Sequence, residues 1–128
     1  MKIISVLLKT VLQMPFGERW NRKILMKLGA QFKGNMDSVW ISNSSFVGGP
    51  FSNLSIGENS NILDDCFFLL RDKIIIGNNV DIAYRTTLIT SSNASASDYI
   101  RSYYSPFTAP IIIEDDVWIG ANSTILGG

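Results

Sequence analysis

The sequence predicts an all-β fold in which short parallel strands wind into a β-helix, a solenoid of hexapeptide repeats. Three observations predict it: a large aliphatic residue returns every six positions, a turn-forming pair follows it, and a small or β-branched residue stands fifth in each unit. Neither a helix nor an alternating strand has a period of six. The alternative is two packed sheets of short strands, whose spacing would be less regular.

The repeat units share one phase and all begin with isoleucine or leucine. Eight units start at Ile56, Ile62, Ile76, Ile82, Leu88, Ile113, Ile119 and Ile125. We expect this first side chain to point into the coil from the middle of a short strand. Asn, Asp and Gly at the third and fourth positions accept the backbone angles of a tight corner. Three strands and three corners then make a turn of about 18 residues, and stacked turns bury one aliphatic column.

The spacing between units predicts where the coil is interrupted. Ile56 and Ile76 are 20 residues apart, which is one turn plus a two-residue insertion. Ile76 and Ile113 are 37 residues apart, which is one turn plus a 19-residue excursion. Residues 91–110 contain no hexad and are rich in Ser and Tyr. We therefore expect one extruded loop at 91–110.

The chain divides into a helical, basic N-terminal segment, residues 1–36, and the β-helix, residues 37–128. Helical spacing of apolar residues predicts one helix over 2–14 and a second over Gly17–Leu28, which Gly29 caps. Residues 1–36 hold seven basic residues against one acid, and residues 37–128 hold four against ten. The segment either covers an exposed end of the coil or lies on an anionic membrane surface, and both readings stay open.

Composition excludes several classes of protein. Cys66 is the only cysteine, which favours a reducing compartment. The apolar start of the chain is far shorter than the ~20 residues that span a bilayer. We expect a cytoplasmic protein, with peripheral contact at the inner face of the membrane as the variant. Nucleotide-binding glycine motifs, His/Cys metal clusters and a nucleic-acid face with interleaved aromatics are missing from the sequence.

Two runs of sequence carry a resemblance to a known family. They are IIIGNNVDIAYRTTLIT, residues 74–90, and APIIIEDDVWIGANSTILGG, residues 109–128. The chain resembles the hexapeptide-repeat acyltransferases, above all the maltose and galactoside O-acetyltransferases and their relatives in polysaccharide gene clusters. The resemblance implies a left-handed parallel β-helix and a homotrimer with active sites between neighbouring copies. It also implies acetyl-CoA as acyl donor and a hydroxyl of a saccharide or polysaccharide precursor as acceptor. The family continues through further hexads, so we expect a C-terminally truncated member.

The same resemblance implies a catalytic histidine at the start of the extruded loop, where it would act as general base. The sequence contains no histidine. Its slot falls at Asn93, or at Ser91 if the count shifts by two positions. Neither side chain is a base at neutral pH, and loss of a general base costs about 10²–10⁴-fold in rate. Two functions follow: an O-acetyltransferase, or a non-catalytic β-helix that serves as a scaffold, an oligomerisation module or an inactive fragment of such an enzyme.

The resemblance also suggests roles for residues outside this slot. Trp118 would sit beside the catalytic cleft or simply pack, and the backbone of Ala121 would contact acetyl-CoA. Asp65, with Asp64, would contact the acceptor or be a plain corner residue. In the loop, ring stacking and hydroxyl groups would contact a sugar, or the side chains would be ordinary loop residues; the candidates are Asp98, Tyr103 and Tyr104. Cys66 stands fifth in its hexad and is expected to be a core residue.

Overall fold

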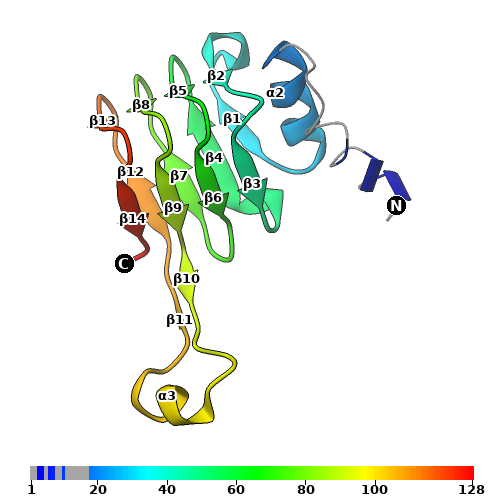
Figure 1. The fold of residues 1–128 in the computed structure, drawn as a ribbon. Coiled ribbons are helices and arrows are strands. Elements are labelled where there is room, and N and C mark those ends of the chain that lie inside the picture. The colour runs from blue at the N-terminus through cyan, green and yellow to red at the C-terminus, as the bar shows by residue number, and fades with distance from the viewer. Residues whose placement is uncertain (1–2, 5, 8–9, 11–17) are drawn as a thin grey trace.

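The computed structural model describes residues 3–4, 6–7, 10 and 18–128, with the backbone alone at 18–21. The chain forms a prism of stacked coils with a helix across one end and an arm that projects from the side (Figure 1). The regular elements are α2 (Glu18–Lys27), β1 (Gln31–Lys33), η1 (Met36–Ser38), β2 (Trp40–Ile41), β3 (Phe46–Gly48), η2 (Phe51–Asn53), β4 (Leu54–Gly57), β5 (Asn61–Ile62), β6 (Phe67–Leu69), β7 (Ile74–Ile76), β8 (Asp81–Ile82), β9 (Thr87–Ile89), β10 (Ser91–Ser92), α3 (Asp98–Tyr103), β11 (Phe107–Thr108), β12 (Ile111–Ile113), β13 (Trp118–Ile119) and β14 (Thr124–Leu126).

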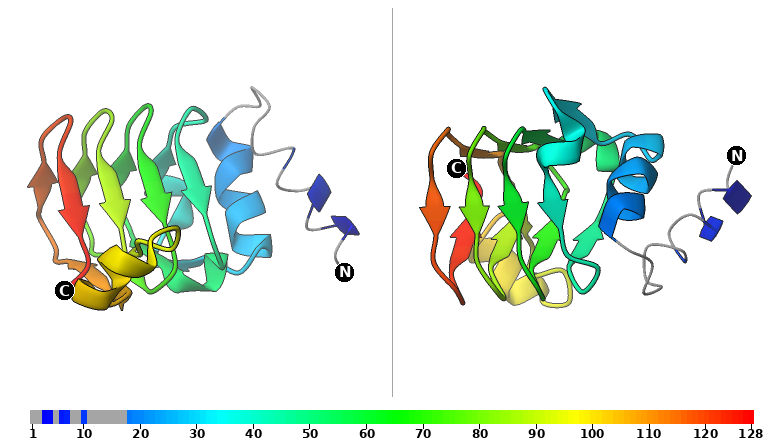
Figure 2. Two further views of the ribbon diagram at one scale, coloured as in Figure 1. Left: turned by 60° about the horizontal axis from the view of Figure 1, so that its bottom comes forward. Right: turned by 90° about the horizontal axis from the view of Figure 1, so that it is seen from above.

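Each coil contributes one strand to each of three sheets. The strand orders are β1-β4-β7-β12 in sheet A, β2-β5-β8-β13 in sheet B and β3-β6-β9-β14 in sheet C. All pairings within these sheets are parallel. Figure 2 shows the coils side by side, with strands running in the same direction on each face. The predicted all-β parallel β-helix is confirmed.

The first residues of the hexads stack into inward columns. In sheet A, Ile56 pairs with Ile76 and Ile76 with Ile113. In sheet B, Ile62 and Ile82 pair in the same way. These side chains are buried, and each contributes roughly 1.5–3 kcal/mol through loss of apolar surface from water. The six-residue period therefore marks the residues that build the core.

The corners follow the predicted chemistry. The fourth residue adopts a left-handed backbone in six of the eight hexads at a non-glycine residue: Asn59, Asp65, Asn79, Arg85, Asp116 and Asn122. Most of them are Asn or Asp, which tolerate this conformation better than other side chains. The small fifth residues turn inward and are buried in the two complete central coils, at Ser60, Cys66, Val80 and Thr86.

The coil begins earlier than the sequence indicated. Strand β1 pairs with β4 in register, with Phe32 opposite Ile56, so the boundary expected at residue 36 falls inside the first coil. Phe32 and Ile41 are nine residues apart rather than six, because the 3-10 turn η1 lies between their strands, and this hides the repeat. Phe68 is the inward residue of β6 in sheet C, and in the sequence it lies between the hexads that begin at Ile62 and Ile76. At this position an aromatic side chain replaces the aliphatic one that the hexad pattern predicts.

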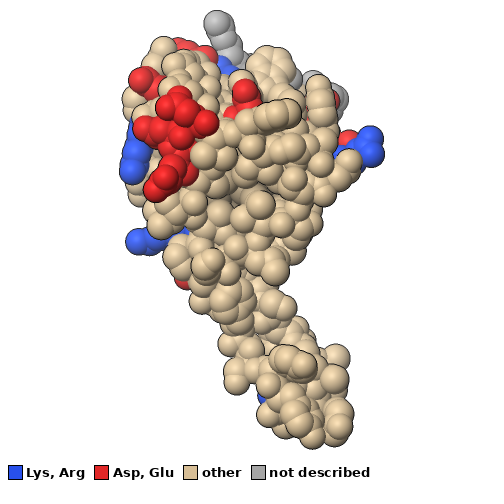
Figure 3. All heavy atoms as spheres, turned by 90° about the vertical axis from the view of Figure 1, so that its left-hand side faces the viewer, with Lys and Arg blue, Asp and Glu red and all other residues tan. Residues whose placement is uncertain are grey.

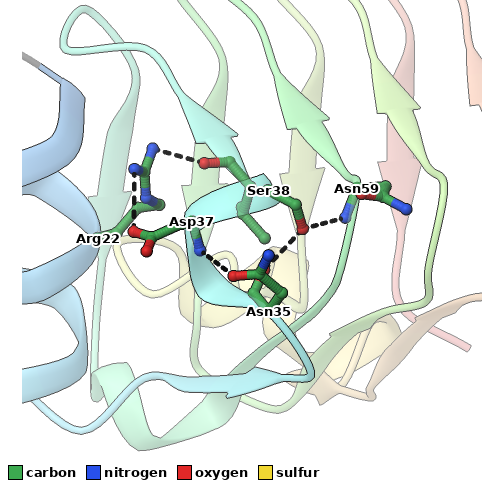
Figure 4. A network of polar contacts seen from close by, with 6 residues as sticks. Arg22, Asn35, Asp37, Ser38 and Asn59 are labelled. Atoms are coloured by element: carbon green, nitrogen blue, oxygen red, sulfur yellow. Dashed lines mark hydrogen bonds and ion pairs between the residues drawn. The ribbon is translucent and has the colours of Figure 1, made fainter.

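Helix α2 covers the N-terminal end of the prism. It matches the predicted Gly17–Leu28 helix to within one residue at each end, and Gly29 follows it with a φ of 112°. Leu25 enters the core. The buried Arg22 guanidinium donates a hydrogen bond to the Val39 carbonyl at 2.6 Å and lies 3.8 Å from the Asp37 carboxylate (Figure 4). The capping reading is therefore confirmed for α2.

The corner after β1 anchors this end further. The Asn35 side chain accepts a hydrogen bond from the Asp37 N–H at 3.0 Å, and Ser38 Oγ donates to the Asn35 carbonyl at 2.6 Å. Ser38 Oγ in turn accepts from the Asn59 N–H of the next coil at 2.8 Å (Figure 4). The network joins the helix, the first coil and the second coil.

The helix predicted over residues 2–14 lies largely outside the described residues. Within it, Ile3, Ile4, Val6 and Leu7 are helical and exposed. Among the helices that the structure describes, none has the length and apolar character to traverse a bilayer. Peripheral membrane contact through this segment stays a prediction.

The arm coincides with the loop expected at residues 91–110. Its two strands, β10 and β11, pair antiparallel and carry it away from the prism (Figure 1). At its tip lies α3, which the sequence did not predict. Ser97 caps this helix, because its Oγ accepts a hydrogen bond from the Ile100 N–H at 3.1 Å.

Candidate functional site

Trp118 stands on the outer face of the last coil. It lies in β13 and pairs with Asp81 of β8, while its neighbour Ile119 joins the edge of the core. Successive strand residues point to opposite faces, so an inward Ile119 requires an outward Trp118. The side chain is 79% exposed. The indole therefore offers a large flat apolar surface on sheet B.

Ala121 occupies the corner between β13 and β14. It is exposed, and the next residue, Asn122, has a φ of 59° and donates its N–H to the Tyr84 carbonyl at 2.9 Å. The N–H of Ala121 has no acceptor among the described residues, so it is available to a ligand. Tyr84 is exposed one coil earlier at this corner and was not singled out from the sequence. Both residues are third in their hexads, and counting hexads would have found Tyr84.

Asp65 lies along the same edge of the prism, two coils before Asn122. Its backbone has a φ of 61°, and its N–H donates to Ser44 Oγ at 2.9 Å. The neighbouring Asp64 carboxylate accepts a hydrogen bond from the Ser42 hydroxyl. Both acids thus take part in corner geometry, and contact with an acceptor stays a prediction.

Asn93 lies on the arm, directly after β10. It is exposed, whereas Ser91 is partly buried and pairs with Thr108 across the antiparallel ladder. Of the two positions considered for the histidine slot, Asn93 is therefore the more open to a ligand. Its amide can donate and accept hydrogen bonds but cannot take a proton at neutral pH.

The remaining predicted loop residues belong to α3 and its C-terminal cap. Asp98 forms an ion pair with Arg101, Tyr103 packs edge-on against Tyr99 with ring centroids 5.2 Å apart, and Tyr104 caps the helix. All three predicted side chains are exposed. Figures 1 and 3 show α3 at the tip of the arm, away from the prism. A role in sugar contact stays a prediction.

Within one copy of the chain, the predicted site residues lie in separate groups. Strand β9 (Thr87–Ile89) connects the corner at Arg85 to Thr90, where the arm begins. The edge that carries Ala121 and the root of the arm that carries Asn93 therefore lie at opposite ends of the strands of sheet C. At the rise of a strand, the stretch from Arg85 to Thr90 spans about 15 Å. A shallow depression on sheet A, between Lys33 and Asp115, contains none of the predicted site residues.

The buried thiol of Cys66 belongs to the core and not to a site. Burial raises the pKa of this thiol, with hydrogen bonds from Thr86, Ser45 and Arg85 opposing the shift in part. Sγ lies 3.3 Å from the Ala83 carbonyl oxygen. A buried thiol with a raised pKa is a poor nucleophile. The expectation that Cys66 is a core residue is confirmed.

Comparison with known proteins identifies similar folds. No protein-family model matches the chain, and no curated protein matches it. The hexapeptide-repeat-containing acetyltransferase VCA0836 of Vibrio cholerae O1 biovar eltor, in complex with acetyl coenzyme A, is similar with a TM-score of 0.77 and 26% identity. That match covers 97% of this chain and 65% of the other. A second structure of the Vibrio cholerae acetyltransferase gives a TM-score of 0.69 and 27% identity, over 97% and 68% of the two chains.

These similarities extend the description of the fold. The chain is an all-β left-handed parallel β-helix, as the resemblance implied, and its structural neighbours are hexapeptide-repeat acetyltransferases. The chain spans 65% of the length of the first of them.

Proposed function

We propose that the chain is an acetyltransferase that uses acetyl-CoA to acetylate a hydroxyl group of a saccharide or polysaccharide precursor. The observation that carries the proposal is the similarity over 97% of the chain to an acetyltransferase with acetyl coenzyme A bound. The outward Trp118 and the exposed corner at Ala121 add support, because they form an open surface that suits such a donor.

Two features of the last coil would hold the donor. The indole of Trp118 gives an apolar surface for the pantetheine chain, and the free N–H of Ala121 gives a hydrogen-bond donor for an amide or carbonyl oxygen. Bound acetyl-CoA supplies an acyl group already activated as a thioester.

The reaction is an acyl transfer. The acceptor oxygen forms a bond to the acetyl carbon, the carbon–sulfur bond breaks, and the proton of the hydroxyl passes to the departing thiolate or to solvent. The Asn93 amide orients the hydroxyl through a hydrogen bond but leaves its proton in place. Turnover is therefore expected to be slow, by about 10²–10⁴-fold relative to a site with a general base.

A homotrimer would join the two separate groups of residues, with the arm of one copy beside the last coil of the next. Sheet C offers an apolar surface for such packing: Phe46 and Phe67 stack on its outer face with centroids 5.1 Å apart, and Leu126 is also exposed there. Sedimentation equilibrium measures the mass directly. A protein that stays monomeric at tens of micromolar would contradict the shared site.

The proposal is tested by mass spectrometry of saccharides incubated with the protein and acetyl-CoA. Asn93→His is expected to raise the rate of acetylation by about 10²–10⁴-fold over the wild type. Ser95→His is the matched control, since Ser95 is another exposed residue of the arm. If Asn93→His gains no more than Ser95→His, the slot is wrong. If no variant acetylates any sugar, the scaffold function is favoured instead.

A further inference from the structure

The turn Arg71–Lys73 lies beside the root of the arm, next to the points where the chain leaves and rejoins the coil. Leu69 pairs with Ile89, and the Asp72 N–H donates to Thr90 Oγ1 at 2.9 Å, so the outgoing strand leaves beside this turn. The returning chain rejoins the coil next to the same turn, because the Ile111 N–H donates to the Lys73 carbonyl at 2.9 Å. The turn contains the two-residue insertion between the second and third coils.

The two cations of this turn are free to meet a ligand. Arg71 and Lys73 are exposed, and neither forms an ion pair with any residue that the structure describes. The acid between them, Asp72, is partly buried and accepts a hydrogen bond from the Lys73 N–H at 2.7 Å. Its carboxylate is therefore committed to the turn, while both cationic side chains extend into solvent.

Two basic residues so close together are unusual in this part of the chain. Residues 37–128 hold only four basic residues against ten acids, and two of the four flank this one turn. Of the others, Arg101 pairs with Asp98 at the tip of the arm, and Arg85 stands at the opposite end of β9. Figure 3 shows acidic atoms gathered on the body well away from the arm. Free cations on the acidic part of the chain, residues 37–128, attract anionic ligands to the place where they stand.

We propose that Arg71 and Lys73 select an acceptor that carries a negative charge in addition to the hydroxyl to be acetylated. This rests on the proposed function, in which the hydroxyl lies at Asn93, just beyond the outgoing strand β10. The recognised chemistry is a pair of anionic oxygens, from a uronic acid carboxylate or a sugar phosphate. A guanidinium binds such oxygens through two parallel hydrogen bonds, and an ammonium adds a point charge.

The test measures binding of three probes to the whole chain by ligand-observed NMR: methyl β-glucuronide, glucose 6-phosphate and the neutral methyl β-glucoside. The charged probes are expected to bind at least about fivefold more tightly than the neutral one, and tighter binding of one of them identifies the anion. Arg71→Gln and Lys73→Gln are each expected to weaken binding of the charged probe by roughly two- to fivefold, as is usual for exposed charge pairs. Neither should change binding of the neutral probe.

Two controls separate this inference from the proposed function. Lys27→Gln removes an exposed cation on α2, at the other end of the prism, and should leave all three probes unaffected. Acetyl-CoA binding is measured on the same proteins and should not change in Arg71→Gln or Lys73→Gln. If it weakens there, the turn binds the donor phosphates and the inference is overturned.

Equal or absent binding of the charged and neutral probes also overturns the inference, and so does an effect of Lys27→Gln as large as that of Arg71→Gln. None of these results bears on whether the wild type binds acetyl-CoA, which the proposed function requires. A protein that discriminates between the probes but binds no acetyl-CoA would refute the proposed function and retain an anion-selective saccharide site.

Discussion

Ile76 pairs in register with Ile113 in sheet A, although the whole arm lies between them in the sequence. Both side chains point into the same buried column. A slip of one residue would turn this face of the strand to solvent, so burial fixes the register across the interruption. The arm can therefore leave and rejoin the coil without changing the stacking.

Truncation of a column residue should be costly. Ile76 is 1% exposed, and Ile76→Ala is expected to lower the free energy of unfolding by about 2–5 kcal/mol, through lost burial and the cavity left behind. Ile112 is an isoleucine of the next strand in the same sheet, but it is 65% exposed. Ile112→Ala should change the free energy by no more than about 0.5 kcal/mol. Urea denaturation measures both, and equal losses would contradict the inward column.

A substitution at the Arg85 corner should stabilise the protein. Arg85 has a φ of 57°, a conformation that costs a non-glycine residue roughly 1–2 kcal/mol but that asparagine adopts more readily. Arg85→Asn is expected to raise the free energy of unfolding by about 0.5–1 kcal/mol. The same urea measurement checks this. A decrease would mean that the arginine side chain stabilises the corner more than its backbone strains it.

Cys66 should make stability depend on alkaline pH. Burial raises the pKa of its thiol in the folded state, so as pH rises the thiol of the unfolded chain ionises first. The unfolded chain then holds fewer protons, and the free energy of unfolding falls from the ordinary thiol pKa of about 8.5 up to the folded-state pKa.

The measurement for this thiol is urea denaturation between neutral and alkaline pH. Wild type should lose stability relative to Cys66→Ser as pH rises through this window. Serine is a fair replacement, because Ser60 fills the same fifth position one hexad earlier and is also buried. If the two proteins lost stability in parallel, ionisation of Cys66 would have no part in it.

The sequence was most informative where the hexads are uninterrupted. From Ile56 onward the aliphatic period placed the core, and the Asn and Asp residues behind it placed the corners, because both depend on local spacing. The excursion between Ile76 and Ile113 was predictable for the same reason, because its length is what remains of their sequence separation after one regular turn is subtracted.

The other features of the fold and of the candidate site depend on contacts in three dimensions, which the spacing of residues along the sequence does not determine. The first coil was missed because the turn between Phe32 and Ile41 lengthens its period. The separation of Asn93 from Ala121 could not be read either, since it depends on which edge of the prism each corner occupies. The sequence did not single out Arg71 and Lys73, and only the fold places them beside the root of the arm.

Binding of acetyl-CoA to residues 1–128, measured by isothermal titration calorimetry, tests the central claim most directly. Saturable binding is expected, and Trp118→Ala should weaken it by about tenfold through loss of an aromatic contact. Trp40→Ala should not, although Trp40 is another exposed indole of sheet B, three strands away. No binding, or equal weakening by both substitutions, would contradict an acetyl-CoA site at the last coil.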